Sequence, residues 1–296
     1  MSNTQLLHTR RPIRGEGFSL VPKRRPLIMG ILNITPDSFS DGGAFFNPDD
    51  AYRHALRMAE DGADILDIGG ESTRPGSEYV DEAEELGRIM PVIRALSGNI
   101  PIPISVDTRR AAVARAALDA GCGIINDVSA CRDPEMPRVA REFHAPIIIM
   151  HMLGDPDTMQ QDPRYEDVVG EVTAFLGSRA GMLERQGVQP DMIVVDPGIG
   201  FGKRFQDNLD LLKSIDTIRA LGYPVAVGAS RKRFLGELLD SGRSGPGERL
   251  CGSLAAAAWC SRTNVEIVRV HDVKETAGFF RVLDAIENPP EYTAAW

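Results

Sequence analysis

The chain has 296 residues, of which 43% are hydrophobic and 25% charged, as expected for a globular protein with a sizeable core. A formal net charge of −9 and a pI near 5.2 argue against general binding to nucleic acid or to anionic membranes. No apolar run approaches membrane-spanning length, and the four cysteines show no C-x-x-C pair and no metal-finger spacing, so we expect reduced cysteines in a cytoplasmic protein.

Residues 1–17 are polar and basic without an apolar signal core, so we expect a flexible N-terminal arm and no secretory signal. Residues 17–22 (GFSLVP) could form a short extra strand that plugs the bottom of the fold. From residue 27 onward, short apolar runs rich in β-branched residues recur eight times. They cover residues 27–32, 65–68, 102–106, 123–128, 146–150, 192–195, 225–228 and 265–270. Runs of this length and composition predict buried strands.

Segments of helical character separate these runs, at residues 49–61, 109–120, 167–186, 208–221 and 251–262. Short buried strands that alternate with helices predict a parallel sheet. Eight such units favour a (β/α)8 TIM barrel over an open doubly wound sheet, which usually has fewer strands. Because no linker-like stretch interrupts the pattern, we expect an α/β fold with a single domain over residues 18–290.

The segment IVVDPGIGFGK, residues 193–203, runs from a buried strand into a carboxylate and three alternate glycines. A carboxylate at the edge of a buried strand is costly unless it is paired, and glycine lets a backbone approach a ligand closely. The stretch alone leaves three alternatives open. They are a ligand-binding loop, a tight turn with a solvated Asp196, and a phosphate cradle, although its G-x-G-x-G spacing matches neither common phosphate-loop pattern.

Polar side chains end all eight runs, where a barrel of this kind builds its active site from the loops after the strands. Asparagine and aspartate are poor strand residues; one alone could cap the next helix, but eight in register favour a functional pocket. Asn33, Asp107, Asn126 and Asp196 offer amides and carboxylates that suit a flat heterocycle with many N–H groups. The carboxylates could instead be metal ligands, although hard-metal sites usually cluster more oxygens than one loop offers here. A single Mg²⁺ shared with substrate phosphates remains a reasonable alternative.

Basic residues gather after the seventh and eighth runs, where barrel enzymes often bind phosphate. Residues 231–233 (RKR) begin a helix, where positive charge opposes the macrodipole, so an anion site explains them better than helix stability does. A solvated basic patch is the alternative, and for His271 the alternative is a buried core histidine. Two loops rich in glycine, serine and proline, residues 35–43 and 69–76, are expected to close over a ligand.

The motifs LNITPDSFSDGG, DIGGESTRPG, SVDT, INDVSA, MHM, VVDPGIGFGK, GASRKRFLG and RVHDV follow one another from Leu27 to Val273. This ordered set resembles the dihydropteroate synthase family of pterin-binding barrels. The resemblance implies a transferase that joins 6-hydroxymethyl-7,8-dihydropterin diphosphate to para-aminobenzoate, giving 7,8-dihydropteroate and diphosphate in folate biosynthesis. It also implies Mg²⁺ as cofactor, a homodimer, and a target of sulfonamides.

The resemblance further implies roles for individual residues. The pterin would be held by Asp107, Asn126, Met150, Asp196 and Lys232. The diphosphate would be held by Asn33, Arg269 and His271, with Asn33 also contacting Mg²⁺. The para-aminobenzoate site and its loops would comprise Asp37, Phe39, Thr73, Arg74, Pro75, Phe201 and Arg233. Catalytic roles fall to Asp107, Asp196 and Lys232, the two carboxylates offsetting positive charge that develops on the pterin methylene as diphosphate leaves.

One position departs from the family pattern, because Arg233 stands where many relatives carry serine or threonine. If it touches the para-aminobenzoate carboxylate, contact geometry and sulfonamide response would change. Two alternative functions are a pterin-barrel methyltransferase with a corrinoid partner and a non-catalytic pterin-binding paralogue. The methyltransferase has no use for a diphosphate site, so Arg269, His271 and Lys232 argue against it. The complete motif set disfavours the paralogue. The apolar face of Leu250–Cys260 could pack on the barrel or against another subunit.

Overall fold

The computed structural model describes residues 10–22, 24–35, 48–71, 80–155, 158–240, 242–243 and 245–289. The strands of its main sheet are β3 (Leu27–Asn33), β4 (Ile65–Gly69), β5 (Ile104–Asp107), β6 (Ile124–Asp127), β7 (Ile147–Met150), β8 (Ile193–Asp196), β9 (Ala226–Val227) and β10 (Ile267–Val270). They are parallel and lie in the order β8-β7-β6-β5-β4-β3-β10-β9. A parallel bridge between Val195 and Val225 brings β8 beside β9 and closes the ring. The predicted single-domain TIM barrel is confirmed.

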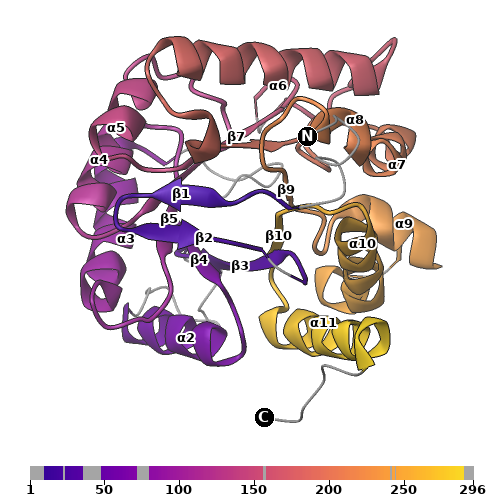
Figure 1. Ribbon diagram of the computed structural model, residues 1–296, viewed down its shortest axis with the longest axis horizontal. Helices are drawn as coiled ribbons and strands as arrows, with labels where there is room; N and C mark the ends of the chain where they lie inside the picture. Colours follow the sequence, from indigo (N-terminus) through magenta and orange to yellow (C-terminus); the bar gives the residue numbers. More distant parts are fainter. Residues whose placement is uncertain are drawn as a thin grey trace.

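Helices surround the strands on the outside of the barrel (Figure 1). They are α2 (Pro48–Glu60), α3 (Glu82–Leu96), α4 (Ala111–Asp119), α5 (Met136–Glu142), α6 (Val168–Arg185), α7 (Phe205–Lys213), α8 (Ile215–Arg219), α9 (Arg233–Asp240), α10 (Leu250–Arg262) and α11 (Val273–Glu287), with the short 3₁₀ turns η2 (Pro190–Met192) and η3 (Pro246–Arg249). The helix expected over 208–221 is two helices that meet at Ser214, the C-cap of α7 and N-cap of α8. No helix in the described part of the chain is long and apolar enough to span a membrane.

A hairpin of β1 (Ile13–Gly15) and β2 (Phe18–Leu20) closes the lower end of the barrel, which is the end where the strands begin. Ile13, Phe18 and Leu20 pack on an apolar layer inside the barrel. The short strand expected within residues 17–22 is therefore confirmed, with an antiparallel partner preceding it. Arg10 donates hydrogen bonds to the carbonyls of Val265 (3.0 Å) and Ser261 (2.8 Å). Residues 10–17, which the sequence assigned to the arm, are thus part of the barrel, and residues 1–9 lie outside the described residues.

The inner wall of the barrel changes from apolar to polar along several of its strands. The lower layer contains Leu27, Met29, Ile65, Ile124, Ile148, Val194, Ala226 and Ile267. Because side chains in a strand alternate between faces, residues two positions further point to the same side, about 6.6 Å higher. At those positions stand Ile31, Asp67, Asn126, Met150, Asp196, Gly228 and Arg269. The strand period therefore builds a polar floor directly above an apolar plug.

Candidate active site

A pocket of about 630 Å³ opens at the C-terminal end of the strands. The predicted site residues among those lining it are Asn33, Asp107, Asn126, Met150, Asp196, Phe201, Lys232, Arg233, Arg269 and His271. Every predicted site residue that lies within the described part of the chain thus lines this pocket. The others, Asp37, Phe39, Thr73, Arg74 and Pro75, lie outside the described residues. The eight strand ends thus bring residues from across the chain to one cavity.

Two carboxylates lie in this pocket: Asp196 is buried, and Asp107 keeps 10% of its side chain exposed. Burial raises the pKa of Asp107 to about 7, although the Arg269 guanidinium beside it acts in the opposite direction. Burial also raises the pKa of Asp196 to about 6, opposed by the hydrogen bond from the Gly198 N–H and by Lys232. Carboxyl groups in a cavity whose pKa values are raised toward neutral pH are a frequent feature of functional sites. Both carboxylates can accept hydrogen bonds from the N–H groups of a ligand at little additional desolvation cost, because the fold has already removed most of the water around them.

Arg269 reaches across the floor of the barrel and holds two carboxylates at once. Its Nε donates to Asp67 Oδ2 at 2.6 Å and its Nη2 donates to Asp107 Oδ2 at 2.7 Å. These acids increase the pKa of the guanidinium against the effect of burial. Asp67 also accepts the Nδ2–H of Asn126 at 3.0 Å. Sequence reasoning missed Asp67, although its place in the middle of a strand two residues from buried Ile65 puts it on the inner face.

The glycine-rich loop after β8 forms a wall of the pocket that side chains from several elements fix in place. The N–H of Gly198 donates to Asp196 Oδ1 (2.6 Å) and that of Gly200 to Asn208 Oδ1 (2.6 Å). Gln160 donates to the Gly200 carbonyl (2.9 Å) and Tyr165 to that of Gly202 (2.6 Å).

All three glycines of this loop have left-handed backbone angles, with φ of +68°, +80° and +58°. A Cβ at Gly198 would stand 2.0 Å from the carbonyl oxygen of His151. The alternate glycines are therefore required by conformation and by close packing. The tight turn with a solvated Asp196, left open by the sequence, is excluded because Asp196 is 7% exposed.

Lys203, the last residue of the same stretch, is buried and joins this loop to the end of β7. Its Nζ donates to the carbonyl oxygens of Phe201 (3.0 Å) and His151 (3.3 Å) and lies 3.0 Å from His151 Nδ1. Burial lowers the pKa of Lys203 to about 7 and that of His151 to about 3, so the imidazole is neutral and can accept at Nδ1. His151 also packs against the rings of Tyr165 and Phe175. It is a core histidine that positions the loop.

An apolar cluster forms one side of the pocket, made of Val128, Met150, Met152, Met159 and Phe201. The Nζ of Lys232 lies 3.7 Å from the centre of the Phe201 ring, within the range of a cation–π interaction. Lys232 also packs against the glycine loop, since a Cβ at Gly200 would stand 2.8 Å from its Cδ. A flat ligand can thus lie between apolar side chains and the polar floor.

The strands β9 and β10 are tied together at the pocket edge by Ser230 and His271. Ser230 Oγ lies 3.1 Å from His271 Nδ1 and accepts the His271 backbone N–H at 3.2 Å. Next to them Arg231, a non-glycine residue with φ of +59°, forms an ion pair with Asp272. The fold brings this serine and this histidine together from the ends of two different strands. Because Ser230 accepts a backbone N–H and is buried, the contact orients the imidazole.

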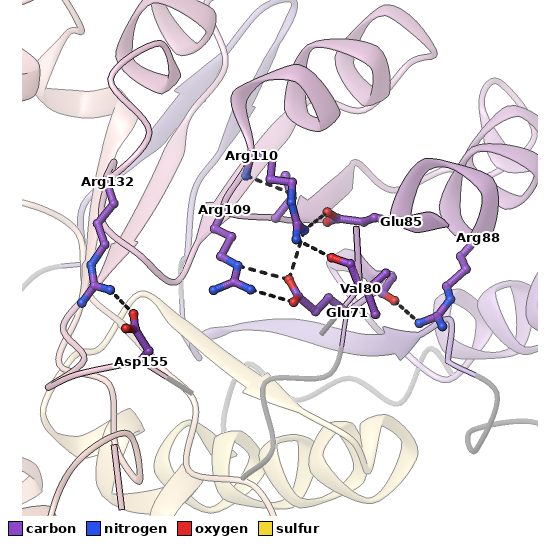
Figure 2. Close-up of polar contacts among 10 residues, drawn as sticks. Glu71, Val80, Glu85, Arg88, Arg109, Arg110, Arg132 and Asp155 are labelled. Atoms are coloured by element: carbon purple, nitrogen blue, oxygen red, sulfur yellow. Dashed lines mark hydrogen bonds and ion pairs between the residues drawn. The ribbon is translucent and has the colours of Figure 1, made fainter. Parts of the chain in front are cut away.

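Arginines brace the pocket rim between β4 and β5. Figure 2 shows Arg109 and Arg110 converging on Glu71, which lines the pocket. Arg109 makes a two-pronged contact with Glu71 (Nε–Oε2 3.2 Å, Nη2–Oε1 2.7 Å). Arg110 contacts Glu71 at 3.1 Å, and also Glu85 and the carbonyl of Val80. Two-pronged arginine–carboxylate pairs are geometrically restrictive, so this rim has little freedom.

The chain matches known proteins along nearly its whole length. A family model described as pterin binding enzyme matches residues 29–271. A dihydropteroate synthase from Synechocystis sp. is 46% identical over 264 residues, which cover 89% of this chain and 91% of that relative.

Two solved structures of Xanthomonas albilineans dihydropteroate synthase share this fold. One, with 4-aminobenzoic acid, has a TM-score of 0.87 and 44% identity and covers 95% of this chain and 99% of that chain. The other, in complex with 7,8-dihydropteroate, has a TM-score of 0.84 and 42% identity and covers 94% of this chain and 99% of that chain.

Barrel, pocket and family model together define a pterin-binding enzyme, and the chain belongs to this family. Within the family, three relatives that are 46%, 42% and 44% identical to this chain are dihydropteroate synthases, and an enzyme of this type is a transferase. The resemblance seen in the ordered motifs is confirmed.

Proposed function

We propose that the protein condenses 6-hydroxymethyl-7,8-dihydropterin diphosphate with para-aminobenzoate, releasing diphosphate and forming 7,8-dihydropteroate. The observation that carries the proposal is a single pocket that joins buried N–H acceptors to a set of cations. The acceptors are Asp107, Asn126 and Asp196, and the cations at the same pocket include Arg231, Lys232 and Arg269. A protein with a net charge of −9 needs such a local positive site to bind an anionic substrate.

The pterin ring is proposed to lie on the polar floor. Asp107, Asn126 and Asp196 would accept its N–H groups, and Met150 would cover one face. Lys232, held near Phe201, would donate to a ring acceptor. Carboxylates that accept N–H bonds from a guanidine-like edge form charge-assisted hydrogen bonds, which are roughly twice as strong as neutral ones.

The diphosphate is proposed to lie between Asn33 and His271, with Arg269 supplying positive charge from the floor. In the described part of the chain no group of three His, Cys, Asp or Glu residues is placed to hold a metal ion. A single amide oxygen such as that of Asn33 fits Mg²⁺, which keeps several waters and is commonly completed by substrate phosphates. We therefore propose Mg²⁺ as cofactor. When bound it would supply positive charge against the departing diphosphate.

The para-aminobenzoate is proposed to enter along Phe201, at the edge of the pocket where Arg233 stands. The side chain of Arg233 is 88% exposed and its Nε lies 3.0 Å from Glu237 Oε1. The family position that carries serine or threonine is thus occupied here by a rim cation paired with an acid. Asp37, Phe39, Thr73, Arg74 and Pro75 are proposed to complete this side of the site by family resemblance.

The mechanism assigns electrostatic work to the chain and needs no covalent intermediate with it. The bond between the pterin methylene carbon and the diphosphate oxygen breaks, and the electron pair leaves with diphosphate. Asp107 and Asp196, held in place by Arg269 and by the Gly198 N–H, stabilise the positive charge that develops on the pterin methylene. The amine lone pair of para-aminobenzoate then forms the new C–N bond, and the nitrogen loses one proton to solvent. Cations at the pocket stabilise the leaving diphosphate.

Diphosphate release measured colorimetrically, with and without para-aminobenzoate and in the presence of Mg²⁺, tests the proposal. We expect release that requires para-aminobenzoate and yields 7,8-dihydropteroate in equal amount. Release without that dependence would indicate hydrolysis. Folded protein that binds a pterin and shows no para-aminobenzoate-dependent turnover would overturn the proposed reaction and favour a pterin-binding paralogue.

A homodimer and a cytoplasmic location are proposed with this function. The inner face of α10 is buried on the barrel through Gly252, Ala256 and Cys260. Its neighbour α11 carries the exposed apolar residues Val282 (62%) and Ile286 (70%). A surface of this kind supports association with a second copy. Light scattering at micromolar concentration should give the mass of two chains, and the mass of one chain would refute the dimer.

A further inference from the structure

We propose that Asp67 is a positioning residue of this site, holding the Asn126 amide and the Arg269 guanidinium in the orientations that the pterin requires. This inference rests on the proposed function, because it concerns the same pterin pocket. Asp67 itself is fully buried and is not among the residues that line the pocket. Any effect it has on substrate must therefore pass through Asn126 and Arg269, which it contacts, or through the repulsion between its charge and that of Asp107.

The contacts of Asp67 converge on one oxygen. Oδ2 accepts the Nε–H of Arg269 at 2.6 Å and the Nδ2–H of Asn126 at 3.0 Å. The partners come from β10 and β6, on either side of β4 in the ring. One buried acceptor thus couples a cation and an amide that lie in different parts of the sheet.

The contact with Asp67 decides which end of the Asn126 amide faces the ligand. An ionised carboxylate has only acceptors, so the amide nitrogen must face Asp67. The Asn126 carbonyl oxygen is then left to face the pocket, where it accepts an N–H. A neutral amide at the floor would otherwise be free to present either a donor or an acceptor. Asp67 thereby makes Asn126 specific for an N–H edge of a heterocycle.

Asp67 also controls how the positive charge of Arg269 is shared. With Nε given to Asp67, the Nη2 group reaches Asp107 at 2.7 Å. The charged groups that act on Asp107 come from every side of it. They are Arg269 on β10, Asp67 on β4, Glu85 on α3 and Asp127 on β6. Of these, Arg269 lowers the pKa of Asp107, whereas Asp67, Glu85 and Asp127 raise it.

Removing the charge of Asp67 should therefore lower the pKa of Asp107, because a repelling charge is lost and Arg269 is left with one acid partner. A carboxylate with a lower pKa remains ionised to lower pH, so the acid limb of the pH profile should move to lower pH. A residue that served only the stability of the fold would leave this limb where it is.

The test uses two substitutions of graded severity and a matched control. Asp67→Asn removes the charge but retains an acceptor, whereas Asp67→Ala removes both. Glu266→Gln and Glu266→Ala make the same changes in another fully buried ion pair, with Arg219 at 3.2 Å, just before β10. Binding of 6-hydroxymethylpterin is measured by calorimetry, and kcat/KM for the pterin diphosphate is measured as a function of pH. Titration of the substrate is common to all the proteins and cancels in the comparison.

We expect affinity for 6-hydroxymethylpterin to fall roughly fivefold in Asp67→Asn and more than about tenfold in Asp67→Ala. KM for para-aminobenzoate should change less than about threefold, because its proposed site lies along Phe201. The acid limb should move to lower pH in Asp67→Asn, while both Glu266 variants lose stability and keep the wild-type affinity and pH profile. Unchanged affinity and an unmoved limb in folded Asp67→Asn would overturn the role of Asp67. Failure of wild-type protein to bind 6-hydroxymethylpterin would instead overturn the proposed function.

A measurement on the wild-type chain covers the case in which the variants do not fold. The Asn126 side-chain amide protons, observed by ¹⁵N-resolved NMR, should exchange slowly with solvent because they face Asp67 rather than the pocket. Saturating 6-hydroxymethylpterin should leave their exchange nearly unchanged. Protection that appears only on addition of the pterin would show that the amide nitrogen faces the ligand, and would refute the proposed orientation.

Discussion

The charge of Asp196 is expected to lower the stability of the fold and to raise the affinity for pterin, and a single substitution can separate these two effects. Its pKa is about 6 in the folded protein, compared with an ordinary value of 3.8. An acid whose pKa is raised by folding binds its proton more tightly in the folded state, so stability is lost as pH rises between those two values. The difference corresponds to about 3 kcal/mol that ionised Asp196 costs the fold at pH 8.

Asp196→Asn removes this charge and still offers an oxygen to the Gly198 N–H, which Asp196 Oδ1 accepts at 2.6 Å. We expect the free energy of unfolding at pH 8 to rise by up to about 3 kcal/mol. The gain should shrink toward zero below pH ~4, where the wild-type carboxyl is protonated in both states. Affinity for 6-hydroxymethylpterin should move the other way, since losing charge-assisted bonds costs about 2–4 kcal/mol, roughly 30- to 1,000-fold.

Urea unfolding at pH 8 and pH 4, together with calorimetry, measures the two effects separately. Asp127→Asn is the matched control, because Asp127 is also buried at the end of a strand but does not line the pocket. Burial raises the pKa of Asp127 as well. However, Asp127 accepts three hydrogen bonds from Ser129 and Cys131, and an Asn amide nitrogen cannot accept the one that the Cys131 N–H donates to Oδ2. Its replacement should therefore lower stability and spare pterin affinity. Unchanged affinity in Asp196→Asn would remove Asp196 from the site. Lower stability at pH 8 would refute the electrostatic reasoning.

Three further substitutions test the walls of the pocket. Lys203→Met leaves three acceptors around the Nζ position without their donor, so we expect the free energy of unfolding to fall by about 2 kcal/mol. KM for para-aminobenzoate should rise, and pterin affinity should change less. Steady-state kinetics and calorimetry that show equal losses for both substrates would contradict this expectation. Gly198→Ala should lower the free energy of unfolding by more than about 3 kcal/mol in denaturant titrations, because both φ and a backbone clash oppose a Cβ. Gly222 also has a positive φ but open space around it, so Gly222→Ala should lower the free energy of unfolding by only about 1–2 kcal/mol. Similar losses for the two variants would exclude the clash. Arg233→Ser should raise KM for para-aminobenzoate less than about tenfold, because an exposed ion pair contributes at most about 1 kcal/mol. A larger increase would place Arg233 in direct contact with the substrate.

Much of the site could be predicted because the barrel follows a short-range rule. Short apolar runs form the strands, which are two to seven residues long, and the alternation of side chains along a strand fixes which of them point inward. Asp107, Asn126 and Asp196 stand at or beside a strand end, where the pattern itself predicts a pocket. The same rule could have found Asp67, but an acid inside an apolar run gives no sign of the partner that makes its burial tolerable.

The sequence by itself determined the order of strands, the barrel and the end of the barrel at which polar groups gather, because each depends on residues close together in the chain. Only the tertiary structure decided how those groups are paired. Arg269 meets Asp67 across 202 residues, and Arg10 binds the carbonyl of Val265 across 255 residues. No local pattern specifies such pairs, since they form only when the ring closes and brings β10 beside β3 and within reach of β4. Closure therefore gives Arg269 a place on the polar floor and makes residues 10–17 part of the barrel.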